Sequence, residues 1–308
     1  MNGSRCGWRS SPKNTLRSPQ QQLEKRVNTP ESEFTIRHVL VALDASAHSL
    51  AALEIATDLA AIVNAELIGL FVEDAQLLRL ARSPHAREVV YPFAELRPLN
   101  IVSVKQRLEA QAEQARRSMA SLANPAKVRW SFRVVRGEVD AEVLAAASDM
   151  DVLALGKTGW SLAAQAQLGS TALAAAHHAP RALLMVQRGL PFKRQVLALV
   201  DGDENSQPTL IAALRLAQAY GNRLVVLIAT TRASTFKERS HKLSALLKQE
   251  SEHLHVHFRQ IPGNDLLSIA HAIRVEGGGI LAINATACST ETVNQLLHHL
   301  DNPILLVR

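Results

Sequence analysis

The sequence predicts an α/β fold made of two tandem copies of one domain, each with a five-stranded, parallel, doubly wound sheet. Three observations lead to this prediction. Apolar runs of strand length alternate with amphipathic helical patterns, and one long segment of the chain recurs further on. Hydrophobic residues make up 47% of the 308 residues but aromatic residues only 4%. Alanine and aliphatic side chains must therefore fill the cores, as is common where helices cover both faces of a parallel sheet.

The internal repeat is visible by direct comparison of two segments. Residues 39–72 (VLVALDASAHSLAALEIATDLAAIVNAELIGLFV) align without a gap with residues 196–229 (VLALVDGDENSQPTLIAALRLAQAYGNRLVVLIA). Each segment opens on an apolar strand that ends in aspartate and continues through a polar turn and an amphipathic helix to a second strand. Further matches follow in the same order: 151–156 with 279–284, and 176–187 with 297–308.

The elements of the first copy follow from hydrophobic periodicity. Apolar residues spaced by three and four predict a helix ending near Val63 and a long helix over 101–122. The expected strands are 39–43, 67–72, 132–135, 152–155 and 182–186, and the expected later helices are 139–147 and 170–177. Three prolines predict an irregular insertion over 73–100. In the second copy, the third helix is expected to be shorter, over 243–252.

Charge and cysteine content exclude several classes of protein. The net charge is +6, and residues 1–34 hold six basic against three acidic residues without periodicity, which predicts a disordered basic tail. The remaining chain is only mildly basic and has no nucleic-acid-binding motif, so we expect no specific nucleic-acid partner. Cys6 and Cys288 have no metal-binding spacing and fit reduced thiols of a cytoplasmic protein. No apolar run is long enough to predict a membrane span.

A glycine-rich loop follows the fourth expected strand of the first copy. Gly156-Lys157-Thr158-Gly159 is followed by nine residues and then by Gly169-Ser170-Thr171, which opens a helix. Glycines let the backbone approach a ligand closely, and a helix N-terminus offers unpaired N–H groups to an anion such as phosphate. Ser170 and Thr171 add hydroxyl groups, and Lys157 adds a cation. A tight turn with a serine helix cap is the alternative interpretation.

The pattern G-x2-G-x9-G-S after a buried strand resembles the ATP-binding loop of the universal stress protein family, whose domains are Rossmann-like. The opening strand VALDAS, the second strand ending in Val72-Glu73-Asp74, and the last strand resemble the same family. The resemblance covers 36–188 and, more weakly, 194–308. It implies a tandem arrangement in which the two copies pair across their last strands as a pseudo-dimer. The implied boundaries are a tail over 1–34, an ATP-binding domain over 35–188, a linker over 189–194 and a degenerate domain over 195–308.

The resemblance also assigns roles to residues by motif position. It implies that Asp44 lies beside the nucleotide and that the main chain at Val72 faces the adenine. The residues expected to hold the phosphates and ribose are Gly156, Lys157, Gly159, Gly169, Ser170 and Thr171. Family members often have histidine or arginine where this chain has Thr158, and His48 is less typical than a small residue at its position. The implied ligand is ATP, with Mg²⁺ as an accompanying cation.

The second copy departs from this motif. Its fourth strand ends in Asn284, no glycine occurs from 280 to 308, and seven residues of the loop are missing relative to the first copy. Asp201 is retained, but a single aspartate at a strand end is also a common helix cap. We therefore expect the second copy to hold no nucleotide and to pack against the first.

Other candidate sites have simpler interpretations. His253, His255 and His257 alternate as on a strand and fit a solvated edge better than a metal site, because no fourth ligand is evident. The pairs at 177–178 and 298–299 fit histidines at helix C-termini. The sequence has no nucleophile elbow, no Walker motif and no SGGxDS loop of the adenine-nucleotide α-hydrolases. No catalytic residue is expected, so ATP hydrolysis would be slow at most.

These observations predict a cytoplasmic stress-response protein that binds ATP in its first copy and changes its contacts with partners when the nucleotide is bound. The expected partners are a second tandem chain, forming a homodimer, or other stress proteins. The alternative is a dimerisation scaffold of the same fold that binds no nucleotide.

Overall fold

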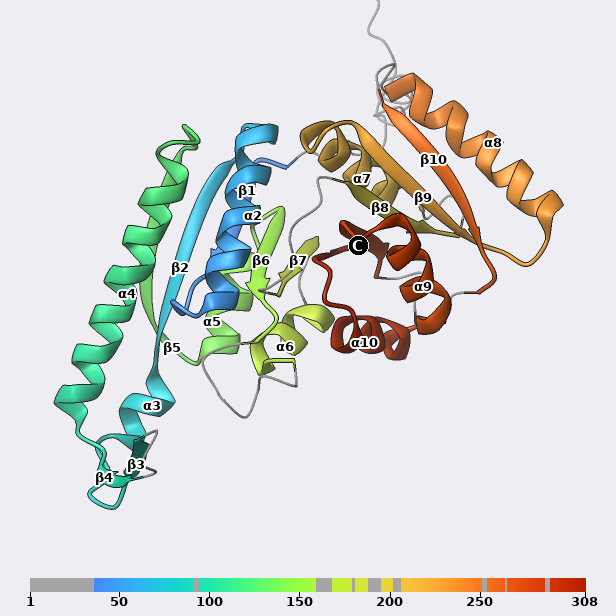
Figure 1. The fold of residues 1–308 in the computed structure, drawn as a ribbon. Helices are drawn as coiled ribbons and strands as arrows, with labels where there is room; N and C mark the ends of the chain where they lie inside the picture. The colour runs from blue at the N-terminus through green and yellow to red at the C-terminus, as the bar shows by residue number, and fades with distance from the viewer. Residues whose placement is uncertain are drawn as a thin grey trace, which may run out of the picture. The chain divides into compact units, whose positions relative to one another are not determined.

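The computed structural model describes residues 36–90, 95–158, 168–178, 181–187, 195–201, 206–250, 254–263, 265–285 and 289–308. The predicted tail and linker lie outside these ranges, as do Gly159, His253 and Cys288. We refer to residues 36–187 as the first half and to residues 195–308 as the second half. Figure 1 shows strands and helices alternating along the chain in both halves.

The first half is a parallel sheet with the strand order β7-β6-β1-β2-β5. Its strands are β1 (His38–Ala42), β2 (Glu66–Asp74), β5 (Trp130–Gly137), β6 (Val152–Gly156) and β7 (Ala182–Val186). Its main helices are α2 (Ala47–Val63), α4 (Ile101–Ala123), α5 (Val139–Ala147) and α6 (Ser170–His178). The chain runs outward from β1 in one direction and returns to build β6 and β7 in the other. The strand order therefore reverses between β1 and β6, which is where doubly wound sheets bind ligands.

The second half repeats this plan with the order β10-β9-β8-β11-β12. Its strands are β8 (Val196–Val200), β9 (Arg223–Ala229), β10 (His255–Ile261), β11 (Ile280–Asn284) and β12 (Ile304–Val307). Its helices are α7 (Gln207–Ala219), α8 (Ala233–Glu250), α9 (Leu266–Glu276) and α10 (Thr290–His299). The predicted α/β class and doubly wound topology are confirmed in both halves.

The two halves join through their last strands, as the family resemblance implied. β7 and β12 pair antiparallel, with Ile304 opposite Met185 and Val307 opposite Ala182, so ten of the described strands form one sheet. Every residue of both strands is buried. On the face covered by α5, α6, α9 and α10, apolar side chains from both halves belong to one continuous core. Small side chains of α6, including Ala172 and Ala175, let that helix lie close to the sheet.

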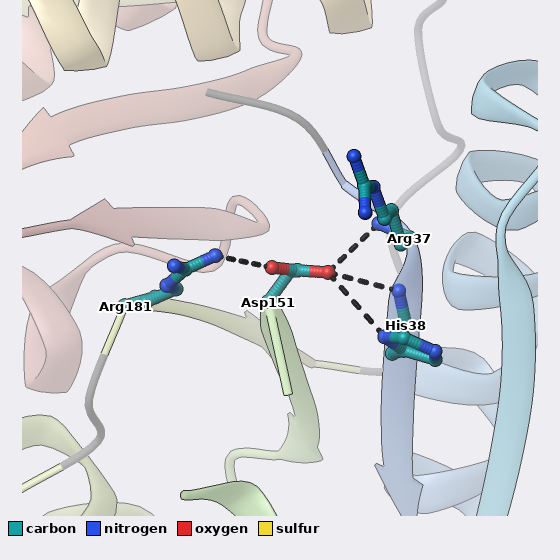
Figure 2. Close-up of polar contacts among 4 residues, drawn as sticks. All are labelled: Arg37, His38, Asp151 and Arg181. Carbon is teal, nitrogen blue, oxygen red and sulfur yellow. Dashed lines mark hydrogen bonds and ion pairs between the residues drawn. The ribbon is translucent and has the colours of Figure 1, made fainter. Parts of the chain in front are cut away.

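A buried carboxylate fixes the amino-terminal edge of the first half (Figure 2). Asp151 is only 8% exposed, and its Oδ2 accepts hydrogen bonds from the main-chain nitrogens of Arg37 at 2.8 Å and His38 at 3.0 Å. Its Oδ1 forms an ion pair with Arg181 at 2.5 Å. The carbonyl of Arg181 in turn accepts from the main-chain nitrogen of Arg308, which follows β12. Asp151 thus ties together the starts of β1, β6 and β7, at the edge opposite to the candidate site.

Two predicted segments differ from the structure. Residues 73–100 are not irregular in their described part, because they hold the short helix α3 (Ala75–Leu80) and an antiparallel hairpin of β3 (Arg87–Val90) and β4 (Glu95–Pro98), at the lower left of Figure 1. Pro98 occupies the last position of its strand, where a missing N–H is tolerated. The helix α8 begins ten residues before the predicted start at Leu243. Its first turns are polar and mostly exposed, so they carry no apolar periodicity.

None of the helices in the described ranges is both long and apolar enough to cross a membrane.

Candidate functional site

The candidate site lies at the carboxyl ends of β1, β2 and β6, next to the point where the strand order reverses. Four pieces of chain meet there: the turn between β1 and α2, the end of β2, the residues that follow β6, and the first turn of α6. Each of these pieces is positioned by a different local interaction.

The turn after β1 leads into α2 through the four residues 43–46. The carboxylate of Asp44 accepts a hydrogen bond from the main-chain nitrogen of Ser46 at 2.9 Å, and Ser46 caps α2 by accepting from the nitrogen of Ser49 at 3.2 Å. Between them, Ala45 has a φ of 60°, a left-handed conformation that costs roughly 1–2 kcal/mol for a residue with a Cβ. The two flanking hydrogen bonds hold this strained turn and keep the half-buried Asp44 at the end of the strand.

The end of β2 presents main-chain groups beyond the last residue of β1. The main-chain nitrogen of Leu43 donates to the carbonyl of Leu70 at 2.8 Å, and the recorded pairing of β1 with β2 ends at the same residue of β2. Main-chain groups of alternate residues point to the same side of a strand, so those of Val72 point to the side where β1 has already ended. On its other side, β2 continues to pair with β5 as far as Asp74. The main chain of Val72 therefore faces the space beside the β1–α2 turn.

Gly156 at the end of β6 is required by packing within the protein. A Cβ at this position would lie 2.8 Å from the carbonyl carbon of His48 and 2.8 Å from the nitrogen of Ser49, in the first turn of α2. No side chain fits there without moving the backbone of α2. The family resemblance assigned Gly156 to the phosphates, but its described neighbours explain the glycine as the contact that brings α2 against β6.

Lys157 closes the base of the loop with its main chain. Its nitrogen donates to the carbonyl of Val186 at 2.9 Å, and its carbonyl accepts from the nitrogen of Gly169 at 2.9 Å. These two bonds tie the start of the loop to β7 and to the start of α6. The middle of the loop, including Gly159, lies outside the described residues.

The side chain of Lys157 is bound to the second half. The residue is only 2% exposed, and its Nζ donates to the carbonyl of Leu300 in the second half. Burial lowers the pKa of Lys157 to about 8, against the opposing attraction of Asp301. The ammonium group is thus bound to the other half, and the expectation that it supplies a cation to the phosphates stays a prediction from the sequence.

The first turn of α6 is the remaining part of the candidate site. Gly169 precedes the helix and has no side chain with which to cap it, and its own N–H is bound to Lys157. The main-chain N–H groups of residues 170–172 have no acceptor within the helix, as in any first turn. Ser170 is exposed, and the first turn contains no acidic residue. The positive end of the helix dipole thus lies at the exposed residue Ser170.

Thr171 is held by a residue that the motif spacing does not predict. Its hydroxyl donates to the carboxylate of Asp140 at 2.6 Å. Asp140 lies in the first turn of α5, directly after β5, where an acidic residue is favoured by the helix dipole. The one sequence feature that could have indicated Asp140 is its position directly after a predicted strand. The bond positions α6, and it means that the Thr171 hydroxyl is shared with a carboxylate.

The corresponding edge of the second half is closed by its own side chains. Ser289 caps α10 by accepting from the nitrogen of Thr292 at 3.1 Å, and Glu291 adds a negative charge to the first turn. The end of β11 is occupied by the buried Asn284, which has a polar interaction of its own. These features distinguish the two halves at the same point of the fold.

The described residues contain no group of three or more side chains arranged to hold a metal ion. Among the alternating histidines, His255 and His257 are exposed on β10, an edge strand of the ten-stranded sheet, as the solvated-edge interpretation predicts. The ring of His257 lies 3.9 Å from the carboxylate of Glu276.

Comparison with known proteins agrees with this architecture. A universal stress protein from Archaeoglobus fulgidus DSM 4304 superposes with a TM-score of 0.65 at 14% identity, over 88% of this chain and 98% of its own. A functionally unknown protein from Pseudomonas aeruginosa PAO1 superposes with a TM-score of 0.58 at 16% identity, over 89% of this chain and 93% of its own. A universal stress protein in complex with cAMP matches 50% of this chain and 99% of its own, at 23% identity and a TM-score of 0.36. No match was found among curated protein sequences.

The fold is that of an α/β protein whose first half carries a candidate site at the carboxyl edge of its sheet. The model of the universal stress protein family matches residues 35–187, the part of the chain that contains this edge. The chain therefore belongs to the universal stress protein family.

Proposed function

We propose that the first half binds an adenine nucleotide, with ATP as the principal ligand, and that this binding controls contacts with partners in a cytoplasmic stress response. The observation that carries the proposal is the first turn of α6, which follows a glycine that has no side chain to cap it, next to a loop whose two ends are tied together by the bond between Gly169 and Lys157. This arrangement directs main-chain donors toward an anion without an opposing side chain at the cap position.

The phosphates are proposed to bind at the N–H groups of residues 170–172 and at the exposed hydroxyl of Ser170. Helix N-termini favour negative charge through both their free donors and the dipole. Gly159 is proposed to contribute from the loop, which remains a proposal from the sequence. Because the described residues offer no cluster of metal ligands, an accompanying Mg²⁺ would be held mainly by phosphate oxygens and water.

The nucleoside is proposed to lie toward β1 and β2. The main-chain groups of Val72 offer one donor and one acceptor, which is the pairing that the edge of an adenine ring requires. The carboxylate of Asp44 provides an acceptor for a hydroxyl or amino group, and its negative charge places it at the nucleoside end, away from the phosphates. The proposed function is binding, with slow hydrolysis at most.

The test introduces a negative charge at the start of α6. Ser170→Glu adds an acid where the helix dipole favours it, so the fold is expected to be unchanged or slightly more stable. The same charge repels the phosphates, and we expect the affinity for ATP, measured by isothermal titration calorimetry on the full chain, to fall at least ten-fold.

The matched control is Gln207→Glu, which places the same charge at the exposed first position of α7 in the second half. Its ATP affinity is expected to equal that of the unmodified protein. If Ser170→Glu binds ATP as tightly as the control, the assignment of the phosphates to α6 is wrong.

A dimerisation scaffold without a ligand is the second candidate function, because the fold already pairs with a copy of itself inside this chain, through the buried strands β7 and β12. This candidate requires that the unmodified protein carries no nucleotide on purification, by mass spectrometry, and shows no thermal shift with ATP.

A further inference from the structure

Lys157 belongs to the loop through its main chain and to the second half through its side chain. The main-chain nitrogen and carbonyl close the loop within the first half, by bonds to Val186 and Gly169. The ammonium group crosses the junction to the carbonyl of Leu300, 143 residues further along the chain. A movement of α6 relative to the second half would therefore have to disturb one of these three bonds.

The acceptor of this contact is the C-terminal end of a helix. Leu300 is the C-cap of α10, and its own nitrogen bonds to the carbonyl of Leu296. Carbonyl groups at a helix C-terminus lack partners within the helix and carry partial negative charge, so they attract a lysine ammonium group. Both Lys157 and Leu300 are buried, so water does not readily replace the contact.

A second cation makes the reverse contact. The guanidinium group of Arg308, which follows β12, donates to the carbonyl of Ala176 in the last turn of α6. The main-chain nitrogen of Arg308 also bonds to the carbonyl of Arg181, next to β7. Each half therefore supplies a cation to the C-terminal end of a helix in the other half.

These contacts hold α6 from both ends. Its N-terminus is fixed through Gly169 to Lys157, and its C-terminal turn is fixed to Arg308. Since the first turn of α6 carries the donors of the proposed phosphate site, the second half determines where those donors lie. The second copy, which lacks the glycine-rich loop after its fourth strand, then has a use that does not need a nucleotide of its own.

We propose that Lys157 is a positioning residue through which the second half fixes the position of Gly169 and of the first turn of α6. ATP binding in the first half then stabilises the C-terminal end of α10 in the second half. The effect of ATP rests on the proposed function. The contact that couples Lys157 to α10 does not depend on a nucleotide. Lys157 acts on the ligand only through the loop, and its side chain does not contact the phosphates.

The experiment is amide hydrogen exchange on the full chain, with and without ATP, read by mass spectrometry. In the unmodified protein we expect saturating ATP to slow exchange at least three-fold in the peptide covering residues 296–300. In Lys157→Met without ATP, we expect exchange over residues 168–173 to rise at least five-fold, and ATP to leave residues 296–300 unchanged. The exposed Lys105 of α4 supplies the matched control, Lys105→Met, which should behave as the unmodified protein.

The outcomes separate this proposal from the proposed function. If ATP binds to the unmodified protein by calorimetry but exchange at residues 296–300 does not change, the coupling is refuted, and this arm needs no variant to fold. If ATP does not bind at all, the proposed function fails, and the nucleotide-free comparison of Lys157→Met with Lys105→Met still decides the coupling. Equal exchange of these two variants over residues 168–173 would overturn it.

Discussion

The two halves of this protein have the same strand order but differ at the carboxyl edge of the sheet, in the residues that begin the helix before the last strand. In the first half, the helix before the last strand is preceded by Gly169, which has no side chain with which to cap it. In the second half, Ser289 caps the equivalent helix and Glu291 occupies its first turn. The difference teaches that the same fold can offer or withhold the main-chain N–H groups at the start of this helix. One capping side chain is enough to engage such a donor.

The amino-terminal edge shows a similar divergence. Asp151 joins three strands of the first half by accepting from Arg37, His38 and Arg181 (Figure 2). The aligned position of the second half is Gly279, with a φ of 135°, and a Cβ there would lie 2.3 Å from the carbonyl oxygen of Gln195. The second half therefore replaces a buried charge by a close backbone contact. Both solutions are structural and lie away from the candidate site.

The largest expected effect comes from moving a second-half residue into the first half. Gly156→Asn places the side chain found at the end of β11 where the backbone of His48 and Ser49 already fills the space. We expect the free energy of unfolding to fall by about 3 kcal/mol or more, because overpacking here must displace the start of α2. Urea unfolding followed by circular dichroism measures the loss.

The reverse change, Asn284→Gly, is the control for this experiment. It removes a buried amide without creating a clash, so a loss of only about 1 kcal/mol is expected. Comparable losses in the two variants would show that the strand ends are not packed differently.

A pH dependence of intermediate size distinguishes Lys157, for which the second copy has Ala285. Burial lowers the pKa of Lys157 from its ordinary value of 10.5 to about 8, with Asp301 as the nearby opposing charge. Between these values the unfolded chain binds more protons than the folded chain, so the free energy of unfolding rises with pH across this window. The contribution of Lys157 to that rise is expected to be roughly 2–3 kcal/mol.

The measurement is urea unfolding at pH 7 and pH 10 for the unmodified protein and for Lys157→Met, so that other titrating groups cancel. The unmodified protein should gain stability relative to the variant as the pH rises. If the difference in free energy of unfolding between the two proteins stays constant with pH, folding does not lower the pKa of Lys157.

The smallest expected effect comes from exchanging the helix caps. Gly169→Ser gives α6 the cap that α10 has, and positive φ among the described glycines occurs only at 221 and 277–279, so a serine at 169 meets no such strain. The new cap should stabilise the protein by about 0.5–1 kcal/mol and occupy one of the proposed phosphate donors. We expect a slightly higher melting temperature and ATP binding weakened about three- to ten-fold by calorimetry.

The counterpart is Ser289→Ala in the second half, which should cost about 1 kcal/mol and leave ATP binding unchanged. Weaker ATP binding in this variant would place the nucleotide, or its influence, in the second half.

The sequence was informative wherever a local pattern decides the outcome. The long helix predicted over 101–122 spans Ile101–Ala123 in the structure, and the helix predicted over 139–147 has those bounds. Such helices are predictable because their buried faces repeat every three or four residues. The start of α8 was not predictable in this way, since its first turns are mostly exposed and are helical without an apolar stripe.

The sequence alone determined the duplication, the alternation of strands and helices, and the loop that joins β6 to α6, because each depends on residues close together in the chain. Only the tertiary structure decided which groups of that loop are available. The sequence pattern predicts Lys157 as a phosphate ligand, whereas in the structure its ammonium group donates to the carbonyl of Leu300 in the other half. The hydroxyl of Thr171 donates to the carboxylate of Asp140, and the backbone of α2 fills the space beside Gly156. These partners are distant in sequence, and a motif does not encode them because hydrogen bonds and excluded volume depend on position in space.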